Sequence, residues 1–165
     1  MIGNDVVDLD LARLESDPFR KGYFQKVFTG SEQAQIRQSN DPICKIWVLW
    51  SMKEAAYKIY NRQTGIRSLN PITFDCLITE ELNNSFSGCV HRGNDTYYSK
   101  TTIDNAEVHS IALTHNCFDN VISVNPLEIN NIGSMPFWDY DGERFASKSH
   151  HGRFTKAVAL LEPKL

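Results

Sequence analysis

The sequence has no long hydrophobic run, no C-x-x-C pair and no large excess of charge of either sign. Its most apolar stretch, from Ile43 to Met52, is interrupted by Cys44 and Lys45 and is too short to span a bilayer. The chain has 17 Lys and Arg against 20 Asp and Glu, a net charge of −3. Broad nucleic-acid binding needs many basic groups, so this balance argues against a nucleic-acid partner.

The cysteines and the N-terminus point to a reducing compartment. Four cysteines lie far apart, and no histidine near them has the spacing of a zinc ligand: Cys44, Cys76, Cys89 and Cys117. We expect reduced, partly buried thiols. The first residues carry acids where a secretory signal would carry a basic region before an apolar stretch. We therefore expect a cytoplasmic protein.

The remaining composition is that of a folded domain. A length of 165 residues, with 41% hydrophobic and 22% charged residues, predicts one domain spanning residues 1–165. Ile2–Leu9 is expected to form a strand on which Asp5 shares a face with Val7 and Leu9. Asp17-Pro18 and Asp41-Pro42 predict helix starts, and so does the capping-box pattern at residues 29–32.

From residue 70 onward the pattern changes to short strands. We expect strands at Ile72–Ile78, Ser85–His91, Thr96–Thr102, Glu107–Thr114, Asn120–Val124 and Phe154–Leu161, with a structured loop at Asn130–Gly142. Gly93-Asn94-Asp95 fits a hairpin turn. Helices followed by a run of strands predict an α+β fold.

The helix expected at Asp41–Asn61 carries a charge on its apolar side. With Trp50 as the reference, Glu54 lies at about 40° on the helical wheel, inside the arc of apolar residues. A buried carboxylate must be paired, hydrogen-bonded or bound to a metal. The alternative is that Glu54 and Lys58 form an ordinary surface ion pair at i and i+4.

Asp5 raises the same question on the first strand, although acids in strands are often edge residues. Two carboxylates on different core elements can together hold Mg²⁺, which fills its other positions with water and phosphate oxygens. Lys53 and Lys58 flank Glu54 and would neutralise phosphate charge. The residues alone therefore suggest a Mg²⁺–phosphate site.

Four segments, in this order, resemble the 4'-phosphopantetheinyl transferases of the holo-acyl-carrier-protein-synthase type. The family's G-x-D strand is matched by Gly3–Leu9 (GNDVVDL), and its F-x-x-K-V-F-T-x-x-E stretch by Phe24–Glu32 (FQKVFTGSE). Its W-x-x-K-E-A-x-x-K helix is matched by Trp50–Lys58 (WSMKEAAYK), and its S-x-S-H segment by Ser147–Phe154 (SKSHHGRF). The resemblance covers residues 1–68 and 145–162, and little matches between 70 and 140. It implies an antiparallel sheet packed against a long helix.

The resemblance also implies a reaction and its residues. The phosphopantetheine of coenzyme A would be transferred to a serine of an apo acyl or peptidyl carrier protein, as in fatty acid biosynthesis, releasing adenosine 3',5'-bisphosphate. Asp5 and Glu54 match the ligands of Mg²⁺, and Glu54 and Lys58 the catalytic residues. Lys53, Lys58, Ser149 and His150 match positions at coenzyme A. A homo-oligomer is implied, with a trimer favoured.

Some positions leave alternatives open. Val7 replaces an acid that some members carry, and Asp8 matches an acid of the small synthases although strand alternation puts it opposite Asp5. Whether Asp8 joins the metal site stays open. Two other functions compete with the transferase: another Mg²⁺-dependent phosphate-ester enzyme, and a non-catalytic relative that binds a carrier protein or coenzyme A. Basic groups for docking an acidic carrier are offered by Arg13, Arg20, Lys21 and Lys26.

Overall fold

The computed structural model describes residues 1–133, 135–138 and 144–161. The N-terminal part contains β1 (Ile2–Asp8), α1 (Leu9–Glu15), α2 (Tyr23–Val27), α3 (Gly30–Gln38) and α4 (Pro42–Thr64). After the 3-10 turn η1 (Pro71–Thr73) come the strands β2 (Asp75–Leu82), β3 (Ser85–Arg92), β4 (Asp95–Asp104) and β5 (Glu107–Leu113). The remaining strands are β6 (Val121–Ser123), β7 (Asn130–Ile132), β8 (Met135–Phe137), β9 (Ala146–His151) and β10 (Phe154–Leu160).

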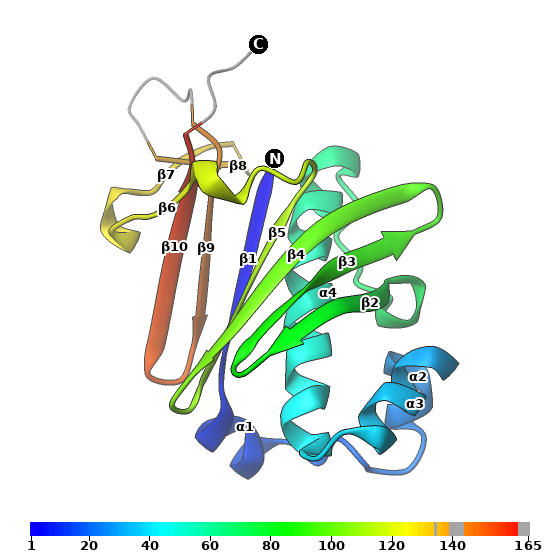
Figure 1. Ribbon diagram of the computed structural model, residues 1–165. Helices are drawn as coiled ribbons and strands as arrows, with labels where there is room; N and C mark the ends of the chain where they lie inside the picture. The colour runs from blue at the N-terminus through cyan, green and yellow to red at the C-terminus, as the bar shows by residue number, and fades with distance from the viewer. Residues whose placement is uncertain (134, 139–143, 162–165) are drawn as a thin grey trace.

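A five-stranded antiparallel sheet forms the centre, in the order β1-β5-β4-β3-β2. The long helix α4 packs across one face of this sheet, mainly against β1 and β5 (Figure 1). A three-stranded sheet, β6-β10-β9, lies beside β1, the edge strand of the five-stranded sheet (Figure 1). β1 therefore has β5 on one side and the second sheet on the other. The expected α+β fold, an antiparallel sheet against a long helix, is confirmed.

Two apolar clusters hold these layers together. The larger lies between α4 and the five-stranded sheet and includes Leu49, Val90 and Tyr97. A smaller cluster of Ile2, Leu113, Val158 and Leu160 joins β1 and β5 to β10. Each fully buried aliphatic side chain stabilises the fold by about 1.5–3 kcal/mol, so both contacts are substantial. β1 is thus fixed from both sides, which matters because it carries Asp5.

Local signals set the helices that face the core. Thr29 and Glu32 form the expected capping box at α3: the Thr29 hydroxyl accepts from the Glu32 N–H, and the Glu32 carboxylate accepts from the Thr29 N–H. Asp41 caps α4 through the Cys44 N–H, and Pro42 occupies the first turn. α4 ends at Thr64, beyond the expected Asn61, where Gly65 takes a left-handed conformation.

The helix start expected at Asp17-Pro18 is wrong. The Asp17 carboxylate accepts from the Phe19 N–H at 3.0 Å, and its carbonyl accepts from the Arg20 N–H, so the segment makes a turn. The helix begins only at Tyr23, after Gly22 in the left-handed region. A side chain that can accept from the chain two residues on competes with helix formation.

Smaller differences concern the boundaries. Leu9 begins α1 rather than ending the first strand, because Asp8 caps this helix. Residues 71–73 form η1, so the strand expected at Ile72–Ile78 begins at Asp75 and runs to Leu82. Part of the expected loop Asn130–Gly142 forms the β7–β8 hairpin, while Ser134 and residues 139–142 lie outside the described residues.

All four cysteines are free, as expected. No helix in the described ranges combines the length and apolarity needed to cross a bilayer.

Candidate active site

Three elements converge on a pocket of about 350 Å³. β1 contributes Asp5, α4 contributes Glu54 and Lys58, and β9 contributes residues 148–151. Val6, Val7, Trp47 and Trp50 complete the wall. A larger groove of about 860 Å³ lies elsewhere on the molecule and includes none of Asp5, Glu54 and Lys58. The charge anomalies seen in the sequence therefore gather in the smaller pocket.

Gly3 allows β1 to lie directly against the backbone of α4. A Cβ at this position would lie 2.1 Å from the carbonyl oxygen of Ala55, far inside contact distance. Any other residue would push the strand away from the helix. The glycine of the G-x-D pattern thus sets the separation between Asp5 and the side chains of α4.

Side chains of β9, rather than its backbone, bind the open edge of β1. β1 pairs with β5 along one edge, and on the other edge every second N–H donates to a β9 side chain. The three contacts are Asn4 N–H to Ser147 Oγ at 2.9 Å, Val6 N–H to Ser149 Oγ at 3.2 Å and Asp8 N–H to His151 Nδ1 at 2.9 Å. We call this set of contacts the β9 side-chain ladder. It satisfies backbone donors that would otherwise be left unpaired.

Asp5 is buried and is held from two directions. Its Oδ1 accepts a hydrogen bond from Ser149 Oγ at 3.0 Å and lies 3.5 Å from Lys58 Nζ. Its main-chain carbonyl accepts from Ser51 Oγ on α4 at 3.3 Å. Burial raises the pKa of the Asp5 carboxyl, against the opposing effects of Lys58 and the serine hydroxyls.

Glu54 and Lys58 stand one helical turn apart beside Asp5. Burial, followed by the charge of Asp5, raises the pKa of Glu54 to about 7, against the opposing charge of Lys58. Lys58 Nζ donates to the Asn4 carbonyl at 2.6 Å. Burial lowers the pKa of Lys58, while both carboxylates act in the other direction. Glu54 and Lys58 are therefore not an isolated surface pair, since Asp5 interacts with both.

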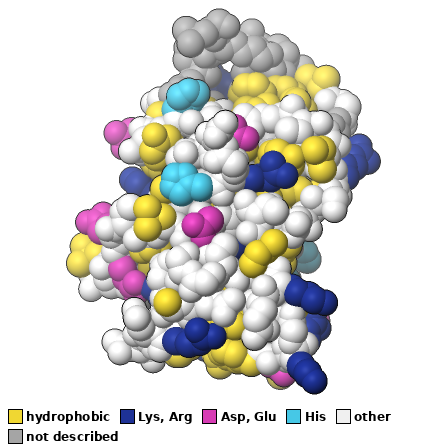
Figure 2. Space-filling view, turned by 90° about the vertical axis from the view of Figure 1, so that its right-hand side faces the viewer, with side chains coloured by type: hydrophobic (Ala, Val, Ile, Leu, Met, Phe, Trp, Pro, Cys, Tyr) yellow, Lys and Arg dark blue, Asp and Glu magenta, His cyan; other side chains and the backbone are white. Residues whose placement is uncertain are grey.

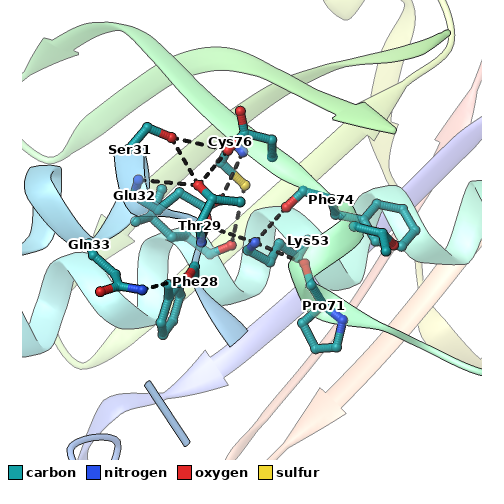
Figure 3. Close-up of polar contacts among 12 residues, drawn as sticks. Phe28, Thr29, Ser31, Glu32, Gln33, Lys53, Pro71, Phe74 and Cys76 are labelled. Carbon is teal, nitrogen blue, oxygen red and sulfur yellow. Dashed lines mark hydrogen bonds and ion pairs between the residues drawn. The ribbon is translucent and has the colours of Figure 1, made fainter. Parts of the chain in front are cut away.

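Lys53 lies in a different place from the one expected for a coenzyme A ligand. Figure 3 shows its ammonium beside residues of α3 and of the segment that leads into β2, and Lys53 is not among the residues that line the pocket. Its Nζ is 2.7 Å from Glu32 Oε2 and donates to the carbonyls of Pro71 at 2.9 Å and Phe74 at 2.5 Å. Both charged side chains are fully buried. Consecutive residues on a helix differ by about 100°, so Lys53 and Glu54 face different neighbours.

Asp8 faces away from the pocket, as strand alternation predicts. Its carboxylate caps α1 and accepts two hydrogen bonds of 2.8 Å from the Arg153 guanidinium. These bonds hold the pKa of Asp8 well below its usual range. The carboxylate is thus already occupied by a cation from the β9–β10 turn.

Ser149 and His150 both line the pocket, Ser149 buried and His150 exposed. Sequence reasoning missed the roles of Ser147, His151 and Arg153, which bind β1 and its end. The available signal was the alternation of polar side chains at 147, 149 and 151, which places all three on one side of a strand.

A second pocket of about 400 Å³ adjoins the first and shares Lys58 and Lys148 with it. Its other lining residues are Tyr57, Asn61 and Arg62 of α4 with Ile129, Asn131 and Pro136 around the β7–β8 hairpin. Burial lowers the pKa of Arg62 to about 10. Three cationic side chains thus border one continuous pair of pockets, which suits a ligand with several phosphates.

In the described ranges, no three His, Cys, Asp or Glu side chains are grouped so that they could hold a metal ion. Mg²⁺ needs fewer protein ligands than this, because one or two carboxylates with substrate phosphates complete its shell. Asp5 and Glu54 fit such an ion: they are oxygen donors in one pocket, and their mutual repulsion would be relieved by a cation.

Comparison with known proteins gives the family. The family model of the 4'-phosphopantetheinyl transferase superfamily (ACPS) matches residues 1–114. A solved apo-ACPS structure from Chronobacterium ammoiniagenes is 13% identical, with a TM-score of 0.52 over 68% of this chain and 93% of that one. No curated protein matches the chain. The family match includes Asp5, Glu54 and Lys58 but ends before β9. The chain therefore belongs to the 4'-phosphopantetheinyl transferase superfamily.

Proposed function

We propose that this chain transfers the 4'-phosphopantetheine group of coenzyme A to a serine of an apo carrier protein and releases adenosine 3',5'-bisphosphate. The observation that carries the proposal is the meeting of Asp5, Glu54 and Lys58 in one pocket, contributed by β1 and α4. Two carboxylates that repel each other beside a lysine suit a cation and a phosphate group better than a purely structural ion pair.

Asp5 and Glu54 would hold the Mg²⁺ of this reaction. When bound, the ion offsets the negative charge of the coenzyme A pyrophosphate. Lys58 would lie beside the same phosphates, where its ammonium stabilises the charge that develops on the leaving phosphate. Lys53 is not part of this proposal, since its ammonium is fully engaged by Glu32 and by two backbone carbonyls.

The bond changes balance without an oxidant or reductant. The serine oxygen of the carrier attacks the phosphorus attached to pantetheine, and the bond from that phosphorus to the bridging oxygen breaks. The Glu54 carboxylate, which lines the same pocket, would accept the serine proton. Adenosine 3',5'-bisphosphate leaves with the bridging oxygen.

Coenzyme A is longer than the first pocket, and the adjoining basic pocket offers room for its nucleotide end. Arg62 and Lys148 border this second space, and Lys58 borders both. Ser149 and His150 form the β9 wall of the first pocket. We propose that the pyrophosphate lies by Lys58 and that the 3'-phosphoadenosine extends toward Arg62.

The carrier protein would dock where basic groups are exposed. On the face that carries α2 and α3, Figure 2 shows Lys and Arg side chains mainly toward the lower part and the right-hand edge, with acidic ones mainly to the left. The exposed candidates are Arg13, Arg20, Lys21 and Lys26. Acidic carriers would be attracted to such a patch although the whole chain is slightly acidic. We also expect self-association, with a trimer favoured.

The test is to incubate the protein with coenzyme A, Mg²⁺ and an apo acyl carrier protein and to weigh the carrier by mass spectrometry. We expect the carrier to gain the mass of phosphopantetheine, and a carrier whose target serine is replaced by Ala to gain nothing. Glu54→Gln and Asp5→Asn should abolish the gain. No gain with any acyl or peptidyl carrier would refute the proposal, and nucleotide release without a carrier would indicate a phosphate-ester hydrolase instead.

A further inference from the structure

We infer that Ser149 is a positioning residue that fixes the Asp5 carboxylate so that one of its oxygens is presented to a cation. This inference rests on the proposed metal site and adds a residue outside the part of the chain that matches the family model. It also gives the two serines of the S-x-S-H segment different roles.

The direction of the hydrogen bonds follows from the single proton of the hydroxyl. Ser149 Oγ accepts from the Val6 N–H at 3.2 Å, because a backbone N–H can only donate. The hydroxyl proton is then available for the carboxylate, and Asp5 Oδ1 lies 3.0 Å away. The serine is 7% exposed, so little water competes for this proton. A backbone donor therefore orients the hydroxyl toward Asp5.

The two carboxylate oxygens of Asp5 have different contacts. Oδ1 receives the Ser149 hydroxyl and faces the Lys58 ammonium at 3.5 Å. The Ser51 hydroxyl, which donates to the Asp5 main-chain carbonyl, also lies close enough to lower the pKa of the carboxyl, but the contacts with Ser149 and Lys58 are both made by Oδ1. The strand itself cannot turn, because Asp5 is opposite Ser110 on β5 and its carbonyl accepts from Ser51. A carboxylate held by one oxygen on a fixed strand offers the other oxygen as a ligand.

Ser147 supplies a matched comparison on the same ladder. Its hydroxyl accepts from the Asn4 N–H at 2.9 Å and is fully buried, so it binds β1 as Ser149 does. Its second neighbour is the Arg62 guanidinium at 3.4 Å, not a carboxylate. Loss of either hydroxyl leaves one backbone donor of β1 unpaired, but only the loss of Ser149 also removes a hydrogen bond from the Asp5 carboxylate.

The experiment measures the binding of Mn²⁺ alone by electron paramagnetic resonance in the wild type, Ser149→Ala, Ser149→Thr, Ser147→Ala and Asp5→Asn. Residues that orient metal ligands typically contribute about 10–100-fold to metal affinity, so we expect Ser149→Ala to raise the Mn²⁺ Kd at least about tenfold. Ser149→Thr keeps the hydroxyl and should stay close to the wild type. Ser147→Ala should keep the wild-type Kd even though thermal unfolding shows a loss of stability similar to that of Ser149→Ala.

Each result has one meaning. Wild-type Mn²⁺ affinity in Ser149→Ala, combined with loss of binding in Asp5→Asn, would overturn the inference while leaving the metal site intact. Equal weakening by Ser147→Ala and Ser149→Ala would also overturn it, since the effect would then come from β1 as a whole. Unchanged binding in Asp5→Asn, or no binding by the wild type, would refute the metal assignment of the proposed function itself.

Discussion

Two of the three lysines on helix α4, Lys53 and Lys58, lie in contrasting surroundings although each is near a carboxylate. Lys53 is fully buried, pairs with the equally buried Glu32 and donates to two carbonyls. Lys58 is partly exposed in a pocket, faces Asp5 at 3.5 Å and stands beside Glu54. The lysines are five residues apart, so the helix directs them to different sides. The centre around Lys53 and Glu32 connects α3 and the segment before β2 to α4. The centre around Lys58, Asp5 and Glu54 lies where α4, β1 and β9 meet.

The two centres differ in how completely their charged groups are paired and hydrogen-bonded. Glu32 accepts from the N–H groups of Thr29 and Cys76 at 2.8 Å each, in addition to its pairing with Lys53. The charges of Glu32 and Lys53 are therefore already paired and hydrogen-bonded within the protein, and neither is available to a ligand. In the pocket, two carboxylates share one lysine, and the pKa of Glu54 rises to about 7. A site that keeps unpaired charge is one that a bound cation or phosphate can complete.

The largest effect is expected from breaking the satisfied centre. Lys53→Met would leave the Glu32 carboxylate buried without its cation and would remove the ammonium donor from the carbonyls of Pro71 and Phe74. Removing one partner of a buried pair typically costs about 3–5 kcal/mol. Urea unfolding should show this loss of unfolding free energy.

The matched control is the double variant Lys53→Met with Glu32→Leu. Replacing a whole buried pair by apolar side chains is often close to neutral, so much of the lost stability should return. If Lys53→Met unfolds at the same urea concentration as the wild type, the centre is not structural and the comparison fails.

The second prediction breaks the unsatisfied centre. Lys58→Met should reduce kcat about 100-fold, as expected for the loss of one group that stabilises charge in the transition state. Its unfolding free energy should change far less than that of Lys53→Met, because the removed charge is partly solvated. Carrier modification measured by mass spectrometry gives the rate, and urea unfolding gives the stability. A pattern with the two variants reversed would contradict the assignment of the two lysines.

The third prediction concerns the pH dependence of stability that comes from His109, whose pKa depends in part on the charge of Lys58. His109 on β5 lies opposite Val6 of β1, and burial, followed by the charges of Lys156 and Lys58, lowers its pKa to about 4. Asn4 Nδ2 lies 3.2 Å from His109 Nε2, which accepts this hydrogen bond in the neutral ring. Because the folded pKa is below the unfolded value of 6.5, the unfolded chain binds the proton first as the pH falls. The contribution of His109 to stability should therefore be complete above pH 6.5 and decrease from there toward pH 4. Glu54, with its pKa raised to about 7, acts in the opposite direction and is the same in the wild type and in His109→Gln.

At pH 5 the wild type should have lost about 2 kcal/mol of unfolding free energy through this residue, relative to pH 8. His109→Gln keeps an amide near Asn4 and removes the titration, so its loss between the two pH values should be smaller by that amount. Urea unfolding at pH 8 and pH 5 measures both. Equal losses in the two proteins would show that His109 is not the group that titrates.

The sequence predicted the features that depend on near neighbours in the chain. The capping box at Thr29 and the Asp41 start of α4 are local signals, and the position of Glu54 inside an apolar arc follows from helix geometry. Resemblance to the family brought Asp5, Glu54 and Lys58 together before the structure did. The place of Lys53 could not be predicted in this way, because its partner Glu32 belongs to another helix and no local pattern connects them.

The β9 side-chain ladder could not be predicted from the sequence for the same reason: its partners are far apart in the chain. The strand that carries Ser149 is separated from β1 by more than a hundred residues, and its serines and His151 replace backbone pairing on one edge. A polar alternation indicates which side chains share a face but not which strand they meet. The Asp17-Pro18 error has a different cause, since the same two residues are compatible with a turn and with a helix start.

The smallest effect concerns a third kind of lysine, one without a carboxylate. Lys21 and Lys26 are exposed, and within the described ranges neither forms an ion pair. If they dock an acidic carrier, Lys21→Glu and Lys26→Glu should each raise the KM for the carrier about fivefold at low salt, since charges at the rim of an interface act mainly on encounter. Stability and kcat should stay near wild-type values, unlike the stability of Lys53→Met and the kcat of Lys58→Met. Arg67→Glu, with the same change of charge on the exposed loop after α4, controls for net charge. An equal rise in that variant would show that the carrier responds to the charge of the whole chain and not to the surface beside α2.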